Sequence, residues 1–160
     1  MDKTYICAGQ YMYEALKDKY NNCIPFNEAL INGINDYDLF SDNFINQRCR
    51  TLNTSIQEYR EKMGLFIKFI NNLNDFNEVH LCFGSEPFCL ANLIGILAYL
   101  ELQNYQGLVI YKEMDENTNR LVNDYQINLN GFIKVYNELN KLIDKNDYLE
   151  SNGKNFIIKK

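Results

Sequence analysis

Two short segments of the sequence combine residue types suited to holding a small ligand. Residues 7–10 (C-A-G-Q) and 82–85 (C-F-G-S) each place a glycine after a strand-like segment and a polar residue before a helical one. Glycine lets the backbone approach a ligand closely, and a helix N-terminus offers unpaired N–H donors at a positive dipole end. If the two turns are neighbours, they form a cradle for a small polar or anionic ligand.

Other polar residues are expected to complete this cradle. Glu86, in the first turn of the second helix, would repel a bare phosphate but accepts hydrogen bonds from hydroxyl or amino groups. Segment 27–40 is irregular and acidic, and we expect Arg48 or Arg50 of the following helix to approach it and clamp an anion. The predicted ligand-binding residues are therefore Gly9, Gln10, Glu28, Arg48, Gly84, Ser85 and Glu86.

The same turns also permit a purely structural interpretation. Glycine at a strand-to-helix turn commonly serves backbone geometry alone. Neither turn carries G-x-G-x-x-G or G-x-x-x-x-G-K-[ST], so the sequence predicts no particular cofactor.

Residues suited to catalysis or metal binding are sparse. His80 is the only histidine, and we expect no carboxylate beside it to orient it as a general base, which favours a structural role. No G-x-S-x-G segment is present, and the five cysteines contain no C-x-x-C pair, so we expect buried thiols and no zinc site. An enzyme is therefore the least favoured of the functions considered.

Charge and hydropathy exclude further classes. Sixteen basic and 21 acidic residues give a net charge of −5, which argues against a nucleic-acid-binding protein. The most apolar stretch, 88–102, has fifteen residues, too few to span a bilayer, and the N-terminus lacks the features of a secretory signal. The sequence therefore predicts a cytoplasmic protein without a membrane segment.

The hydrophobic patterning predicts an α/β fold. Strands are expected at 3–8, 23–26, 79–84, 108–111 and 120–129, and helices at 11–20, 41–50, 55–73, 88–102 and 130–143. Ser41 or Asp42, Ser55, Ser85 and Asn130 are the expected helix caps. This order predicts a single three-layer domain over 1–160, with a mostly parallel sheet and antiparallel strands near the C-terminus. Asn152-Gly153 predicts an added hairpin over 147–160.

The predicted helix over 88–102 is apolar on nearly every face. Such a helix is buried deep in its own domain or covered by a partner chain. This leaves open a second hypothesis, a protein-interaction or homo-oligomerisation module without a small ligand.

Several of these motifs resemble a bacterial family of unknown function, domain of unknown function number eighteen thirty-five. The likeness covers about residues 4–112 and rests on the first glycine turn, on Glu28, Leu30 and Gly33 as a D-x-L-x-x-G-like core, on Arg48, and on the second turn at 83–85. Gln10 and Glu28 stand where the family has Asp, and Ile34 where it has Pro. The resemblance implies the fold and the place of the site, and no reaction.

Overall fold

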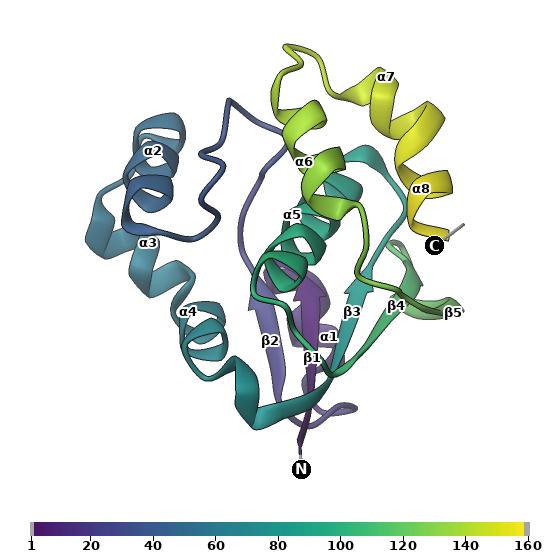
Figure 1. Ribbon diagram of the computed structural model, residues 1–160. Coiled ribbons are helices and arrows are strands. Elements are labelled where there is room, and N and C mark those ends of the chain that lie inside the picture. The colour runs from purple at the N-terminus through teal and green to yellow at the C-terminus, as the bar shows by residue number, and fades with distance from the viewer. Residues whose placement is uncertain (1, 159–160) are drawn as a thin grey trace.

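A five-stranded sheet forms the centre of residues 2–158, the part of the chain that this computed structural model describes (Figure 1). Its strands are β1 (Asp2–Ala8), β2 (Cys23–Phe26), β3 (Phe76–Phe83), β4 (Leu108–Asp115) and β5 (Arg120–Gln126). They lie in the order β2-β1-β3-β4-β5, with β5 antiparallel to β4 and every other pair parallel. The predicted α/β fold with a mostly parallel sheet is confirmed.

Helices cover both faces of the sheet, and this makes three layers (Figure 1). On one face α1 (Gly9–Leu16) packs Met12 and Leu16 against Cys7 and Cys82 of β1 and β3. The opposite face carries the main core. Its helices are α2 (Asp42–Leu52), α3 (Ile56–Lys62), α4 (Gly64–Asn71), α5 (Pro87–Leu102) and α6 (Phe132–Asn140), with a 3₁₀ turn, η1 (Leu73–Asp75), before β3.

The apolar helix predicted over 88–102 is α5, at the centre of that core. Residues 89–100 are all buried, and α5 contacts β3, α6 and the C-terminal helical segment. A helix without a polar face requires cover on all sides. Here the chain itself supplies that cover, so the burial of α5 needs no second copy.

The predicted C-terminal hairpin is wrong. Up to residue 158 this segment forms α7 (Asn146–Tyr148), a π-helical turn η2 (Leu149–Gly153) and α8 (Lys154–Ile158), and residues 159–160 lie outside the described part. Leu149 and Ile157 are fully buried in the main core, and η2 contacts α5. Asn-Gly favours a hairpin only when two strands pair around it, and the burial of these side chains favours helix instead.

The predicted helix over 55–73 is two helices, because the chain bends between α3 and α4 at Met63, whose φ is −98° and ψ 8°. The capping box at its start is confirmed: Ser55 Oγ accepts from the backbone N–H of Glu58, whose carboxylate accepts from Ser55 N. Ser41 caps α2 in the same way, by accepting from the backbone N–H of Phe44.

Two other predicted caps are wrong. The N-caps of α5 and α6 are Glu86 and Gly131, one residue after the predicted Ser85 and Asn130, and neither makes a side-chain cap bond. Gly131 has a φ of +92°, a left-handed conformation that favours glycine. The N-terminus of α6 is capped from outside, by a carboxylate described below.

Candidate functional site

The two glycine turns lie side by side at the carboxyl edge of the sheet. Cys7 of β1 pairs in parallel register with Cys82 of β3, so Gly9 and Gly84 follow at the ends of neighbouring strands. The strand order reverses here, because the chain runs from β1 to β2 on one side and β3 lies on the other. In open α/β sheets this switch point is where ligands bind. The juxtaposition predicted from the sequence is present.

The first turn is open to solvent. Gly9 has a φ of +79°, and no atom lies within 4 Å of the place that a Cβ would take. The exposed Gln10 side chain accepts a hydrogen bond from Asn27 Nδ2 at 3.0 Å and donates to Glu14 Oε1 at 3.0 Å. Asn27 directly follows β2, so amide groups join the ends of β1 and β2 along this rim.

The second turn is covered by a side chain that sequence analysis missed. Glu116, from the turn between β4 and β5, lies against Gly84 where a Cβ would stand. Its Oε1 accepts a hydrogen bond from Cys89 Sγ at 2.8 Å, in the first turn of α5. A carboxylate is stabilised at a helix N-terminus, so Glu116 occupies the place that a bound anion would take. Burial and this hydrogen bond raise the pKa of Cys89 to about 12, so its thiol is protonated at neutral pH.

Beside Gly84 the surface is hollowed and acidic. A hollow of about 410 Å³ is lined by Ser85, Glu86, Glu113, Met114, Asp115, Glu116, Asn117 and Val122. Within residues 2–158, the one ion pair that these side chains form joins the buried Glu113 carboxylate to Lys154 Nζ of α8 at 2.7 Å. The remaining carboxylates give the hollow a negative charge, which favours amino and hydroxyl groups over free anions.

Glu28 and Arg48 were predicted to contribute to the ligand site, and the structure places them together in the core. Both side chains are fully buried. Arg48 donates to both Glu28 carboxylate oxygens, at 2.7 and 3.0 Å, to the carbonyls of Asn32 and Ala29, and to Asn35 Oδ1. A guanidinium has five N–H donors, and all five are used, so Arg48 has none left for an anionic ligand.

This ion pair belongs to a network that holds segment 27–40 against α5 and α6. The Glu28 carboxylate also accepts a hydrogen bond from the Tyr59 hydroxyl at 2.7 Å. Burial raises the pKa of Tyr59. Asn92 accepts from Leu30 N and donates to the Glu28 carbonyl. Asn140 exchanges hydrogen bonds with the Asn35 backbone. Asn92 is the one amide or charged side chain of α5 before Glu101, and this was the available signal for a buried polar contact.

His80 has the neighbouring carboxylate that sequence analysis did not expect. Its Nε2 lies 2.9 Å from Glu78 Oε2, and its ring stacks on Tyr5 with centroids 4.6 Å apart. Burial lowers the pKa of His80 below its usual value, although the Glu78 carboxylate acts in the opposite direction. His80 projects from β3 toward the α1 face. Neither the glycine turns nor the acidic hollow includes it, so the structure does not join His80 to the candidate site.

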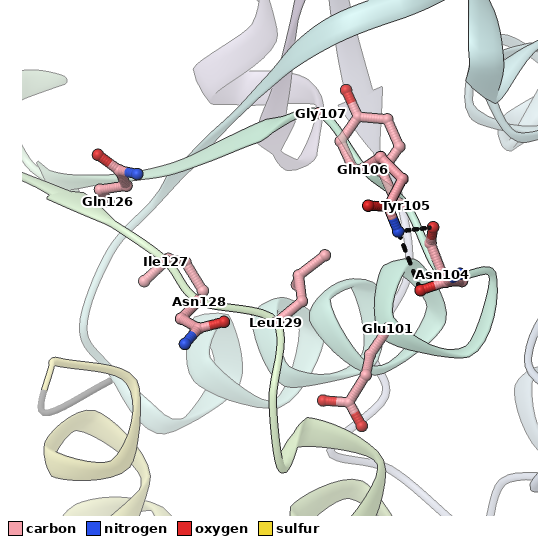
Figure 2. Close-up of a pocket in the computed structure, with 9 residues that line it drawn as sticks. All are labelled: Glu101, Asn104, Tyr105, Gln106, Gly107, Gln126, Ile127, Asn128 and Leu129. Carbon is pink, nitrogen blue, oxygen red and sulfur yellow. Dashed lines mark hydrogen bonds between the residues drawn. The ribbon is translucent and has the colours of Figure 1, made fainter.

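A larger hollow lies at the other end of the sheet. Its volume is about 610 Å³, and its lining comes from the end of α5, the residues before β4 and the residues after β5 (Figure 2). Gln106 Nε2 donates to the carbonyl and side chain of Asn104. Glu101 caps α6 by accepting from the backbone N–H groups of Phe132 and Ile133, at 2.9 and 3.4 Å. Three of its polar side chains, Glu101, Asn104 and Gln106, therefore bond within the protein. The hollow also lies away from the edge where such folds bind ligands.

The comparisons with known proteins add no relatives. No protein-family model, curated protein or solved structure matches the chain. Within residues 2–158, no helix has the length and apolar character to cross a bilayer, and no group of three or more His, Cys, Asp or Glu side chains is arranged to hold a metal ion.

Proposed function

We propose that this protein binds a small polar ligand, bearing amino or hydroxyl groups, at the switch point between β1 and β3. The observation that carries the proposal is the adjacency of the Gly9 and Gly84 turns at the carboxyl edge, with α1 and α5 leaving toward opposite faces. The open Gly9 turn and the acidic hollow beside Gly84 provide surface for such a ligand.

Charge favours amino and hydroxyl groups over phosphate. Glu86, Asp115 and Glu116 line the hollow, and Glu116 already occupies the N-terminal end of α5. An anionic ligand would meet these carboxylates in a partly desolvated site, where like charges repel strongly. Gln10, Asn27 and Ser85 supply neutral hydrogen-bonding groups on the same rim. The proposed location is the cytoplasm, consistent with five free cysteines, and the family resemblance stays a prediction.

The test is a chemical-shift titration of the uniformly ¹⁵N-labelled protein against polyamines, amino sugars, amino acids and nucleosides, each compared with a phosphorylated or carboxylated analogue. We expect saturable shifts at Gly9, Gln10 and Ser85 for an amino- or hydroxyl-bearing compound, and weaker binding of its anionic analogue. Glu86→Gln should weaken binding of a cationic ligand, whereas Glu138→Gln, an exposed change on α6, should not. Shifts confined to residues 104–107, or tighter binding of the anionic analogues, would contradict the proposal.

A second candidate function, self-association, is favoured by one different observation. β5 is an edge strand that is exposed along nearly its whole length, including Leu121 and Val122 at 40% and 54%. Unpaired edge strands are templates for pairing with another chain. Sedimentation velocity at micromolar concentration tests it: a concentration-dependent dimer that Val122→Lys abolishes supports self-association, and a monomer throughout removes it.

A further inference from the structure

Three thiols lie on neighbouring strands, on the face of the sheet that α1 covers. They are Cys23 of β2, Cys7 of β1 and Cys82 of β3, under Met12 and Leu16 of α1. Cys7 Sγ and Cys23 Sγ are 2.8 Å apart, and none of the three cysteines is in a disulfide. Such an approach between two thiols on separate strands places them in position to react with each other.

The three thiols differ in exposure. Cys7 and Cys82 are fully buried, whereas Cys23 is half-buried and lines a hollow of about 500 Å³ together with Tyr13 and Lys68. A small oxidant therefore reaches Cys23 first. The hydrogen bond from Cys7 lowers the pKa of Cys23, and the same bond raises the pKa of Cys7. The thiolate, which is the reactive form, is thus favoured on the accessible sulfur.

We propose that Cys23 and Cys7 form an oxidation site, in which a peroxide converts the two thiols into an intramolecular disulfide. The Cys23 thiolate attacks one oxygen of hydrogen peroxide; an S–O bond forms, the O–O bond breaks, and hydroxide leaves and takes up a proton as water. Cys7 then attacks the sulfenic sulfur; the S–S bond forms, the S–O bond breaks, and the departing hydroxide takes the Cys7 proton as a second water. The sulfur pair loses two electrons and the peroxide gains them.

The fold allows this bond to close. A disulfide requires a sulfur separation near 2.05 Å, so the two sulfurs must approach by about 0.8 Å. β2 is a four-residue edge strand paired on one side only, with β1, so a shift of this size disturbs no other strand pairing. The bond would join β1 to β2 and enclose α1 in a covalent loop.

Peptide mapping of the full chain tests the proposal directly. After hydrogen peroxide treatment, alkylation of free thiols and digestion with trypsin, Cys7 lies in peptide 4–17 and Cys23 in peptide 20–48, each with no other cysteine. Cys82 and Cys89 share peptide 69–112, so the partner of Cys7 is identified by mass. We expect peptides 4–17 and 20–48 to be linked, two hydrogens below their summed mass, and separated again by dithiothreitol. Linkage of 4–17 to 69–112, or oxidation with no linkage, would overturn the proposal.

Variants separate the two roles. Cys7→Ala should leave Cys23 as a sulfenic acid that dimedone traps, while Cys23→Ala should abolish both dimedone labelling and the linkage. Cys82→Ala and Cys49→Ala serve as matched controls and should retain the linkage. In the untreated protein, alkylation at neutral pH should modify Cys23 faster than Cys89 by about tenfold or more; equal rates at the two cysteines would contradict the assignment of Cys23 as the reactive thiol.

Discussion

The buried pair of Glu28 and Arg48 fixes the longest irregular segment of the chain. Removing two charges from water is costly, and a buried ion pair is tolerated only when the remaining hydrogen-bonding groups are satisfied. Arg48 meets this condition because all five of its N–H groups donate hydrogen bonds. Two go to the Glu28 carboxylate and three to other oxygens of residues 29–35. The pair is therefore a structural anchor for residues 27–40.

Removal of one partner should destabilise the protein strongly. We expect Arg48→Ala to lower the free energy of unfolding by about 3–5 kcal/mol, because it leaves Glu28 buried and unpaired. The control is Arg60→Ala, whose exposed pair with Asp42 at 3.4 Å should change stability by less than about 1 kcal/mol. Urea denaturation followed by circular dichroism measures both. Equal losses in the two variants would show that the buried pair does not anchor the segment.

The sequence identified the right residue types at the candidate site but not all of their partners. Gly9 and Gly84 were predictable because parallel strands bring their carboxyl ends to one edge. That Glu28 and Arg48 bind each other depends on how segment 27–40 folds back on α2, and a spacing of twenty residues does not determine this. Glu116 reaches Gly84 only because the β4–β5 hairpin bends over that edge, which is a contact between distant parts of the sequence.

Among the elements, those with strong hydrophobic periodicity were predicted well and those defined by tertiary contacts were not. The strands and α5 follow from apolar runs bounded by turn residues. The C-terminal segment was mistaken for a hairpin because Asn152-Gly153 is a local turn signal, whereas the burial of Leu149 and Ile157 against the core decides the structure. The bend at Met63 was not predicted, and the N-caps of α5 and α6 lie one residue after the predicted ones.

The N-terminus of α6 offers a test at this scale. The Glu101 carboxylate of α5 accepts hydrogen bonds from the first backbone N–H groups of α6. Glu101→Ala should therefore lower the free energy of unfolding by about 1 kcal/mol. Glu138→Ala, an exposed change in the last turn of the same helix, should alter it by no more than about 0.5 kcal/mol. Thermal and urea denaturation of both variants provide the comparison. A loss no greater for Glu101→Ala than for Glu138→Ala would exclude the cross-helix cap.

At the scale of the whole molecule, the two faces of the sheet are covered unequally. One face carries the main core, while the other carries α1 alone among the described helices. His80 lies on the thinly covered face. Burial and the charges of Lys112 and Lys3 lower its pKa, and the charge of Glu78 raises it. The charge state of this histidine therefore links the stability of the fold to pH.

The sign of this dependence follows from the lowered pKa of His80. The unfolded chain binds a proton near pH 6.5 and the folded chain only at lower pH, so the contribution is complete above about pH 6.5 and is lost as the pH falls through the folded value. Glu78, whose pKa is lowered chiefly by its hydrogen bond to His80, acts in the same direction in a more acidic range. Urea denaturation between pH 7.5 and 5 should show a decline that His80→Gln reduces. The ring resonances of the single histidine report its folded pKa, and a value above 6.5 would contradict the prediction.

The position of β1 has a consequence for synthesis on the ribosome. β1 is an interior strand, yet its two neighbours are made at very different times: β2 follows after one short helix, whereas β3 begins at Phe76. While the nascent chain lengthens through α2, α3 and α4, one side of β1 stays without its pairing partner, and unpaired strand edges promote aggregation. The β1–α1–β2 unit must therefore wait, incompletely paired, until the ribosome has released β3.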